Sequence, residues 1–221
     1  MSSKTIKGFT FIYLSILILH IVLDTMESFW HYLTKPALVL SLLMFFLKQS
    51  THLDKRTRNV LVLALLFSLL GDSLLMFVSK SMHFFTGGLV AFLLAHIFFI
   101  ILFYRKKSKN PRGFGLSLGT ILYMLLILNF ISSNLGTMRY PVILYMVIIM
   151  LMFLAATHRQ KEVGKLSYNL ILIGAILFVV SDSILALNKF YKPILYPQIS
   201  IMLTYGLAQL LITLGILRQD N

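Results

Sequence analysis

The chain has 221 residues, of which 58% are hydrophobic and only 12% are charged. Soluble domains of this size are about half apolar and about a quarter charged, so this composition excludes an ordinary globular domain and favours a membrane protein. The net charge of +13 does not indicate nucleic-acid binding, because the 20 Lys and Arg residues fall between apolar blocks rather than along one stripe.

The apolar blocks predict an all-α membrane protein in which residues 1–221 form one domain of eight transmembrane helices. Lys4 and Lys7 before Phe9 resemble the start of a signal peptide, but no small-residue cleavage site follows, so we expect a retained first helix. In chain order, the expected spans are 8–24, 34–48, 59–78, 85–104, 114–132, 140–157, 168–188 and 198–217.

The distribution of Lys and Arg predicts the orientation of these helices. Cytoplasmic loops of membrane proteins carry the excess of these residues. Fifteen fall on one side of the expected topology and five on the other, which places both termini in the cytoplasm. The larger group comprises Lys4, Lys7, Lys48, Lys55, Arg56, Arg58, Arg105, Lys106, Lys107, Lys109, Arg112, Arg159, Lys161, Lys165 and Arg218.

An internal repeat is visible between residues 69–75 (LLGDSLL) and 179–185 (VVSDSIL). The two segments fall in the third and seventh expected helices, which are separated by an even number of helices and so cross in the same direction. The pattern predicts two parallel halves of four helices each. Chance similarity of two Leu-rich helices is the alternative.

Two acidic residues, Asp72 and Asp182, lie well inside expected spans. An ionised Asp near the bilayer centre costs at least about 2.5–3.5 kcal/mol, so such residues normally face the bundle interior and have a function. Each lies about 20 Å along its helix at about 1.5 Å per residue, so both should lie at one level. Two carboxyl groups in a partly dry cavity do not both ionise easily and could serve as general acid and general base. Hydrogen bonding between helices is the structural alternative.

Other polar side chains could complete a cavity around this acid pair. They are His20, His96, Tyr145, Tyr205 and Gln209, of which the last two are four residues apart and share a helix face. Interhelical hydrogen bonds are an equally good explanation for each of them. The sequence has no HExxH motif or paired-His spacing, so we expect no metal site and no cofactor.

Five basic residues fall on the side with fewer charges, at the level of a lipid phosphate. Snorkelling of these side chains to the interface is the alternative to phosphate binding. Ser73 and Ser183 follow the two Asp residues directly, but neighbouring helical residues point about 100° apart, so we expect backbone-bonded serines rather than nucleophiles. The five basic residues are Lys35, Lys80, Arg139, Lys189 and Lys192.

Short motifs follow one another along most of the chain. They are Lys35-Pro36, Gly71-Asp72, residues 88–92 (GLVAF), 95–97 (AHI), Pro141 with Tyr145 and Met150, Ser181-Asp182, Leu185-Ala186, Lys189-Phe190, Tyr205 and Ala208-Gln209. In this order and spacing they resemble the YhhN-like integral membrane family, which includes animal lysoplasmalogenases.

The resemblance implies an eight-helix fold and hydrolysis of the vinyl ether bond of lysoplasmalogens, with a bacterial inner membrane as the expected location. Asp72 and Asp182 would be the catalytic pair. His96, Tyr145, Tyr205, Gln209, Lys35 and Lys189 would bind a lysophospholipid substrate among membrane lipids.

Two alternatives come from other functional classes. An acid pair within parallel repeats is also typical of a small proton- or solute-coupled transporter, although the helices lack paired Gly or Pro interruptions. A non-catalytic lipid-binding membrane protein is the other alternative. Loss of activity in Asp-to-Asn variants would separate an enzyme from the latter.

Overall fold

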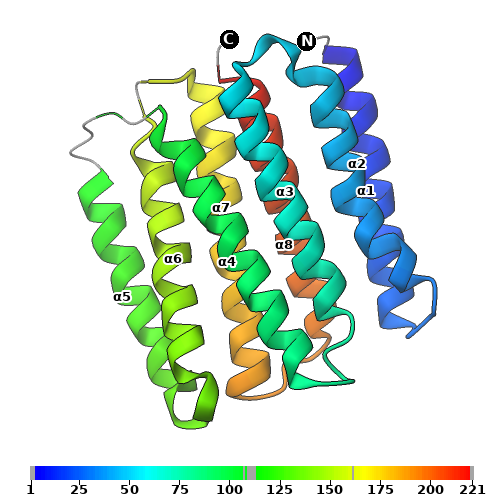
Figure 1. Ribbon diagram of the computed structural model, residues 1–221, viewed down its shortest axis with the longest axis vertical. Helices are drawn as coiled ribbons and strands as arrows, with labels where there is room; N and C mark the ends of the chain where they lie inside the picture. Colours follow the sequence, from blue (N-terminus) through cyan, green and yellow to red (C-terminus); the bar gives the residue numbers. More distant parts are fainter. Residues whose placement is uncertain (1–2, 107, 109–112, 161, 220–221) are drawn as a thin grey trace.

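The chain forms a bundle of α-helices in the computed structural model, which describes residues 3–106, 108, 113–160 and 162–219 (Figure 1). Lys107, Lys109, Arg112 and Lys161, four of the residues in the charge count, lie outside the described residues. The helices are α1 (Ser3–Thr25), α2 (His31–Gln49), α3 (Lys55–Leu75), α4 (Met82–Tyr104), α5 (Gly113–Ile131), α6 (Arg139–Thr157), α7 (Lys165–Phe190) and α8 (Pro197–Leu217). Short 3-10 turns lie at Ser50–His52, Ser132–Asn134 and Gly136–Met138, and the described residues contain no strand.

Each helix overlaps one of the eight expected spans, and the largest differences are at helix ends. α1 begins at Ser3 rather than residue 8, and α3 ends at Leu75 rather than residue 78. The third helix ends early because the chain tightens into a turn, in which the Phe77 amide donates to the Leu74 carbonyl and the Lys80 amide donates to the Phe77 carbonyl.

Six helices of the described chain are long and apolar enough to cross a membrane. They are α1, α3, α4, α6 with its preceding 3-10 turn, α7 and α8. The described part of the α5 region, Leu118–Asn134, forms a shorter apolar helix. α2 is not among the six, and it carries Lys35, Pro36 and Lys48 within 19 residues. The structure therefore supports an integral membrane protein with six clear spans.

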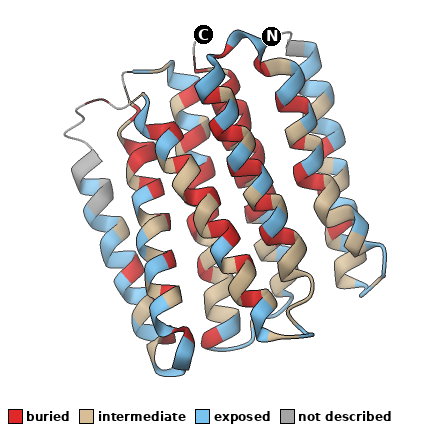
Figure 2. Ribbon diagram, viewed as in Figure 1, coloured by how far each residue is buried: buried red, intermediate tan, exposed pale blue. Residues whose placement is uncertain are grey.

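Consecutive helices run antiparallel, and the described ends of α1 and α8 near the two termini lie at the same end of the bundle (Figure 1). The α1–α2 hairpin packs against α8 and α3, while α5 packs against α6 and α7. α3, α4, α7 and α8 lie between the α1–α2 hairpin and the α5–α6 pair (Figure 1). Buried positions concentrate on these central helices (Figure 2). Many exposed positions of the bundle carry large apolar side chains that suit contact with lipid.

Small residues allow α7 and α8 to approach closely. A Cβ added at Gly174 would lie 3.1 Å from the Ala208 carbonyl oxygen, and one added at Gly215 would lie 3.2 Å from the Ile171 nitrogen. Close backbone approach at small residues is the usual means of packing helices in lipid, where no hydrophobic effect drives their association. This packing fixes the two helices that carry Asp182 and Tyr205 relative to each other.

Candidate active site

A cavity of about 430 Å³ lies between the helices, toward the end of the bundle opposite the termini. Its wall takes residues from the last turns of α1 and α7 and from the first turns of α2 and α8. Five charged residues line it, namely Asp24, Lys35, Asp72, Asp182 and Lys189. The two intramembrane carboxyl groups identified in the sequence therefore share one cavity.

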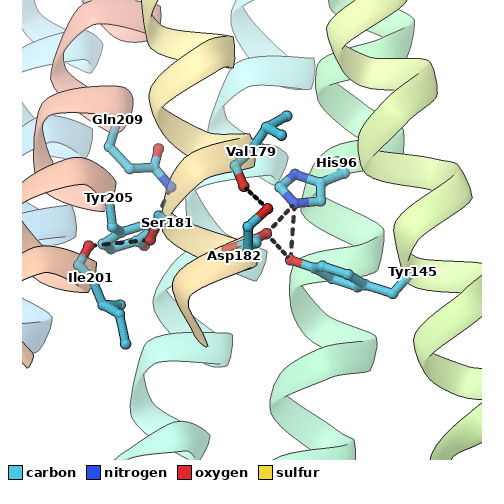
Figure 3. A network of polar contacts seen from close by, with 9 residues as sticks. His96, Tyr145, Val179, Ser181, Asp182, Ile201, Tyr205 and Gln209 are labelled. Atoms are coloured by element: carbon cyan, nitrogen blue, oxygen red, sulfur yellow. Dashed lines mark hydrogen bonds and ion pairs between the residues drawn. The ribbon is translucent and has the colours of Figure 1, made fainter. Parts of the chain in front are cut away.

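Asp182 on α7 receives hydrogen bonds from two other helices (Figure 3). The Tyr145 hydroxyl on α6 donates to Asp182 Oδ2 at 2.5 Å, and His96 Nε2 on α4 lies 3.3 Å from the same oxygen. His96 Nε2 also lies 3.0 Å from the Tyr145 hydroxyl oxygen. The Asp182 side chain is 15% exposed, whereas the His96 side chain is fully buried. Asp182 is thus held in place but open to the cavity.

The hydrogen-bond pattern fixes the tautomer of a neutral His96. The Tyr145 hydroxyl has a single proton and donates it to Asp182, so its oxygen accepts from His96 Nε2–H. His96 Nδ1 is buried without a hydrogen-bond partner. In this arrangement the unpartnered nitrogen is the unprotonated one, and His96 acts as a donor toward Asp182 and Tyr145.

Asp72 on α3 has a different environment. The Tyr205 hydroxyl on α8 donates to Asp72 Oδ2 at 2.6 Å, and Gln209 Nε2 donates to the Tyr205 oxygen at 3.3 Å. Tyr205 and Gln209 are one helical turn apart on α8, as the i, i+4 spacing requires (Figure 3 shows this pair). Asp72 is 2% exposed, so it is more deeply enclosed than Asp182 and has one donor instead of two.

Of the basic residues expected near a lipid phosphate, Lys35 and Lys189 line the cavity. The Lys189 ammonium also lies over the Phe85 ring, 5.4 Å from its centroid. Lys80, Arg139 and Lys192 are not among the lining residues. The Lys80 ammonium lies 4.8 Å from the centroid of the Phe77 ring, outside the cavity wall.

Two further expectations have different outcomes. The Ser73 and Ser183 hydroxyls donate to the carbonyl oxygens four residues earlier, at 2.8 Å and 2.7 Å, which confirms that they are backbone-bonded. His20 does not join the cavity wall. Its Nδ1 lies 3.0 Å from the Thr34 hydroxyl, so it links α1 to α2 instead. No group of three or more potential metal ligands is found among the described residues.

Sequence reasoning missed one charged residue of the wall. Asp24 lies in the last turn of α1, and its position near the end of an apolar span resembles that of an ordinary loop carboxylate. Its position in the sequence could have indicated this role, because the short connection between α1 and α2 brings the end of α1, with Asp24, next to the start of α2, with Lys35. The remaining wall is mostly apolar and includes Met124, Ile127, Val142, Met146, Ile149 and Val179.

The sequence model of the YhhN family matches residues 30–216 of the chain. The chain belongs to the YhhN family. It is 33% identical to human lysoplasmalogenase TMEM86B over 159 residues, and this segment covers 70% of this chain and 62% of that protein. It is 32% identical to bovine lysoplasmalogenase TMEM86A over 160 residues, and this segment covers 68% of this chain and 62% of that protein.

The chain therefore spans about three fifths of the length of these curated relatives of the YhhN family. No solved structure matches it. The family membership agrees with the resemblance noted in the sequence, and the match includes every residue of the two carboxyl networks.

Proposed function

We propose that this protein is a membrane hydrolase that cleaves the vinyl ether bond of lysoplasmalogens. The products are a fatty aldehyde and a glycerophospho-headgroup. The observation that carries the proposal is the pair of carboxyl groups, Asp72 and Asp182, in the wall of one largely apolar cavity. The names of the two relatives as lysoplasmalogenases support it.

The chemistry of a vinyl ether suits two carboxyl groups with different roles. Protonation of the β-carbon of the double bond produces an oxocarbenium ion, and water adds to this ion to give a hemiacetal. Addition of water returns one proton to the enzyme. The hemiacetal then breaks its C–O bond to glycerol, and the proton of its hydroxyl group passes to the glycerol oxygen, which releases the aldehyde and the free glycerol hydroxyl. One group must therefore donate a proton, and the other must stabilise positive charge and orient the water.

The hydrogen bonds support different roles for the two carboxyl groups. Asp182 receives donors from Tyr145 and His96 and is partly exposed to the cavity, which suits a carboxylate that faces the cation and the water. Asp72 has a single donor, Tyr205, and is almost completely enclosed, which suits the neutral acid. We therefore assign proton donation to Asp72 and cation stabilisation to Asp182.

The other expected site residues take supporting roles in this proposal. Tyr145 and His96 position Asp182, and Gln209 positions Asp72 through Tyr205. Because Tyr145 and Tyr205 also line the cavity, both can contact the lipid. Lys35 and Lys189, which line the cavity, would bind the phosphate. The proposed mechanism needs no cofactor or metal.

We also propose that the whole chain is one domain in which all eight helices cross the membrane as two parallel halves of four. The hydrogen bonds support this arrangement because they connect the halves in a crossed manner. Asp72 on α3 bonds to α8, and Asp182 on α7 bonds to α4. In a parallel repeat, α3 corresponds to α7 and α8 corresponds to α4. The bonded pair α3–α8 is then equivalent to the bonded pair α7–α4. The excess of Lys and Arg at the end with the termini supports a cytoplasmic location for both termini. The membrane in this proposal is a bacterial inner membrane.

The test is aldehyde release from a defined lysoplasmenylethanolamine by the detergent-purified protein, measured by mass spectrometry. Asp72→Asn and Asp182→Asn should each nearly abolish release while the melting temperature stays close to that of the wild type. Glu162→Gln is the matched control, because Glu162 is an exposed acidic residue away from the cavity. A chelator should leave the rate unchanged.

Full activity in both Asp variants would refute the acid-pair mechanism. Absence of aldehyde from a folded wild type, with choline headgroups also tested, would refute the proposed reaction. Uptake of a solute into sealed vesicles under a proton gradient, without product, would then favour a transporter.

A further inference from the structure

The part of the cavity wall that comes from the α1–α2 hairpin is charged, and the part that comes from α5 is apolar. A further charged wall residue, Lys189 on α7, packs over the Phe85 ring. The α1–α2 hairpin contributes two wall residues, Asp24 and Lys35, and both are charged. On the opposite side of the bundle, α5 contributes only Met124 and Ile127, and most of the wall residues from α6 are also apolar (Figure 1). Asp72 and Asp182 come from α3 and α7, which lie between these two sides.

This gradient indicates how an amphiphile would lie in the cavity. The hydrocarbon chain would occupy the side of α5 and α6, and the charged headgroup would lie at the α1–α2 hairpin. In a lysoplasmalogen the vinyl ether joins the chain to the headgroup-bearing glycerol, so it would lie between the two ends, at the level of the carboxyl pair. The acid chemistry leaves Asp24 without a role, although it is a partly buried ionisable group in the same wall.

Asp24 and Lys35 present both signs of charge to a ligand. Asp24 lies in the last turn of α1, and Lys35 lies near the start of α2. No ion pair joins them in the part of the chain that the structure describes, so both charges remain available to the cavity. Lys35 lines the same cavity as the two intramembrane carboxyl groups, so a phosphate bound to it would lie in the cavity that holds them.

We propose that Asp24 and Lys35 form a headgroup subsite for zwitterionic lipids, with Lys35 binding the phosphate and Asp24 binding the ammonium group. This inference rests on the proposed function and adds to it a residue that selects the headgroup. A carboxylate that bonds an ammonium group in a partly dry site gives a charge-assisted hydrogen bond. Asp24 would favour ethanolamine over glycerol headgroups, which carry no cation, and would disfavour bare anionic phosphates by repulsion.

The test measures binding separately from hydrolysis. Two saturated alkyl-ether lysophospholipids are used as probes, one with an ethanolamine and one with a glycerol headgroup, because neither has a vinyl ether to cleave. Asp24→Asn should weaken binding of the ethanolamine probe about tenfold and leave the glycerol probe unchanged or slightly tighter. Lys35→Gln should weaken both probes, and Asp24→Glu should retain the ethanolamine preference.

Glu27→Gln is the matched control for Asp24. Glu27 is an exposed carboxylate three residues later, in the turn after α1, and it does not line the cavity. The Glu27→Gln variant should bind both probes with the affinity of the wild type. Equal melting temperatures of the two variants would show that any difference arises from the headgroup and not from folding.

The outcomes distinguish this inference from the proposed function. A discriminating effect of Asp24→Asn on binding, together with no aldehyde release by the wild type, would support the subsite and refute the hydrolase. Aldehyde release by the wild type with no change of headgroup preference in Asp24→Asn would refute the subsite alone. Equal weakening of both probes in that variant, or no binding of either probe to the wild type, would also overturn it.

Discussion

Removal of the Tyr145 hydroxyl tests how strongly the rate of the proposed reaction depends on the hydrogen bond from Tyr145 to Asp182. In Tyr145→Phe, Asp182 loses its 2.5 Å donor and keeps only His96 Nε2 at 3.3 Å. Hydrogen bonds to charged groups contribute about 1.5–3 kcal/mol, and each 1.4 kcal/mol corresponds to about tenfold, so kcat should fall roughly 10- to 100-fold. The KM should change less than kcat, because the lost hydroxyl holds Asp182 while the ring that lines the cavity is kept.

The assay is aldehyde release over a range of substrate concentrations, so that kcat and KM are separated. Tyr140→Phe is the matched control, because Tyr140 lies on the same helix and is 83% exposed. An unchanged kcat in folded Tyr145→Phe would contradict a positioning role. A large rise in KM at constant kcat would show instead that Tyr145 mainly binds substrate.

Two further predictions concern stability. Gly174→Ala should lower the free energy of unfolding by about 1–3 kcal/mol, since the new Cβ would lie 2.8 Å from Ile212 Cγ1. Gly8→Ala should leave the free energy of unfolding unchanged, because no atom lies within 4 Å of a Cβ at that position. Thermal unfolding in detergent distinguishes the two variants. Hydrogen bonds from the Thr57 hydroxyl and amide, with a smaller contribution from an arginine, hold the pKa of Asp54 below its ordinary value. Asp54 is the N-cap of α3, so Asp54→Ala should cost about 1 kcal/mol at neutral pH. The difference from wild type should shrink as the pH falls through the lowered pKa, and a constant difference at all pH values would contradict this.

The general position of the site could be predicted from the sequence because depth along a helix follows from counting residues. Asp72 and Asp182 fall at matching depths, and the structure places both in one cavity wall. The i, i+4 spacing of Tyr205 and Gln209 likewise predicted a shared face, and the two side chains are hydrogen-bonded. These inferences depend only on regular helical geometry.

The partners of each carboxyl group could not be predicted, because they depend on how each helix is rotated about its axis. In soluble proteins the apolar stripe of a helix reveals that rotation, but here outward positions contact lipid and are as apolar as inward ones. The sequence therefore gave no reason to assign His96 to Asp182 or Tyr205 to Asp72. For His20 the sequence left open a place beside the acid pair or an interhelical hydrogen bond, and the structure shows the second, to Thr34.

The crossed hydrogen bonds connect formation of the site to assembly of the bundle. In hydrocarbon, a carboxyl group without a partner is costly, so the helix that carries it is stable only where a donor is supplied. α3 obtains its donor for Asp72 from α8, and α7 obtains one of its donors for Asp182 from α4. Helices α1 to α4 alone would leave Asp72 without Tyr205, and helices α5 to α8 alone would leave Asp182 without His96. The two carboxyl groups therefore reach their bonded arrangement only when both sets of helices have packed together, which makes the proposed catalytic site dependent on the completed fold.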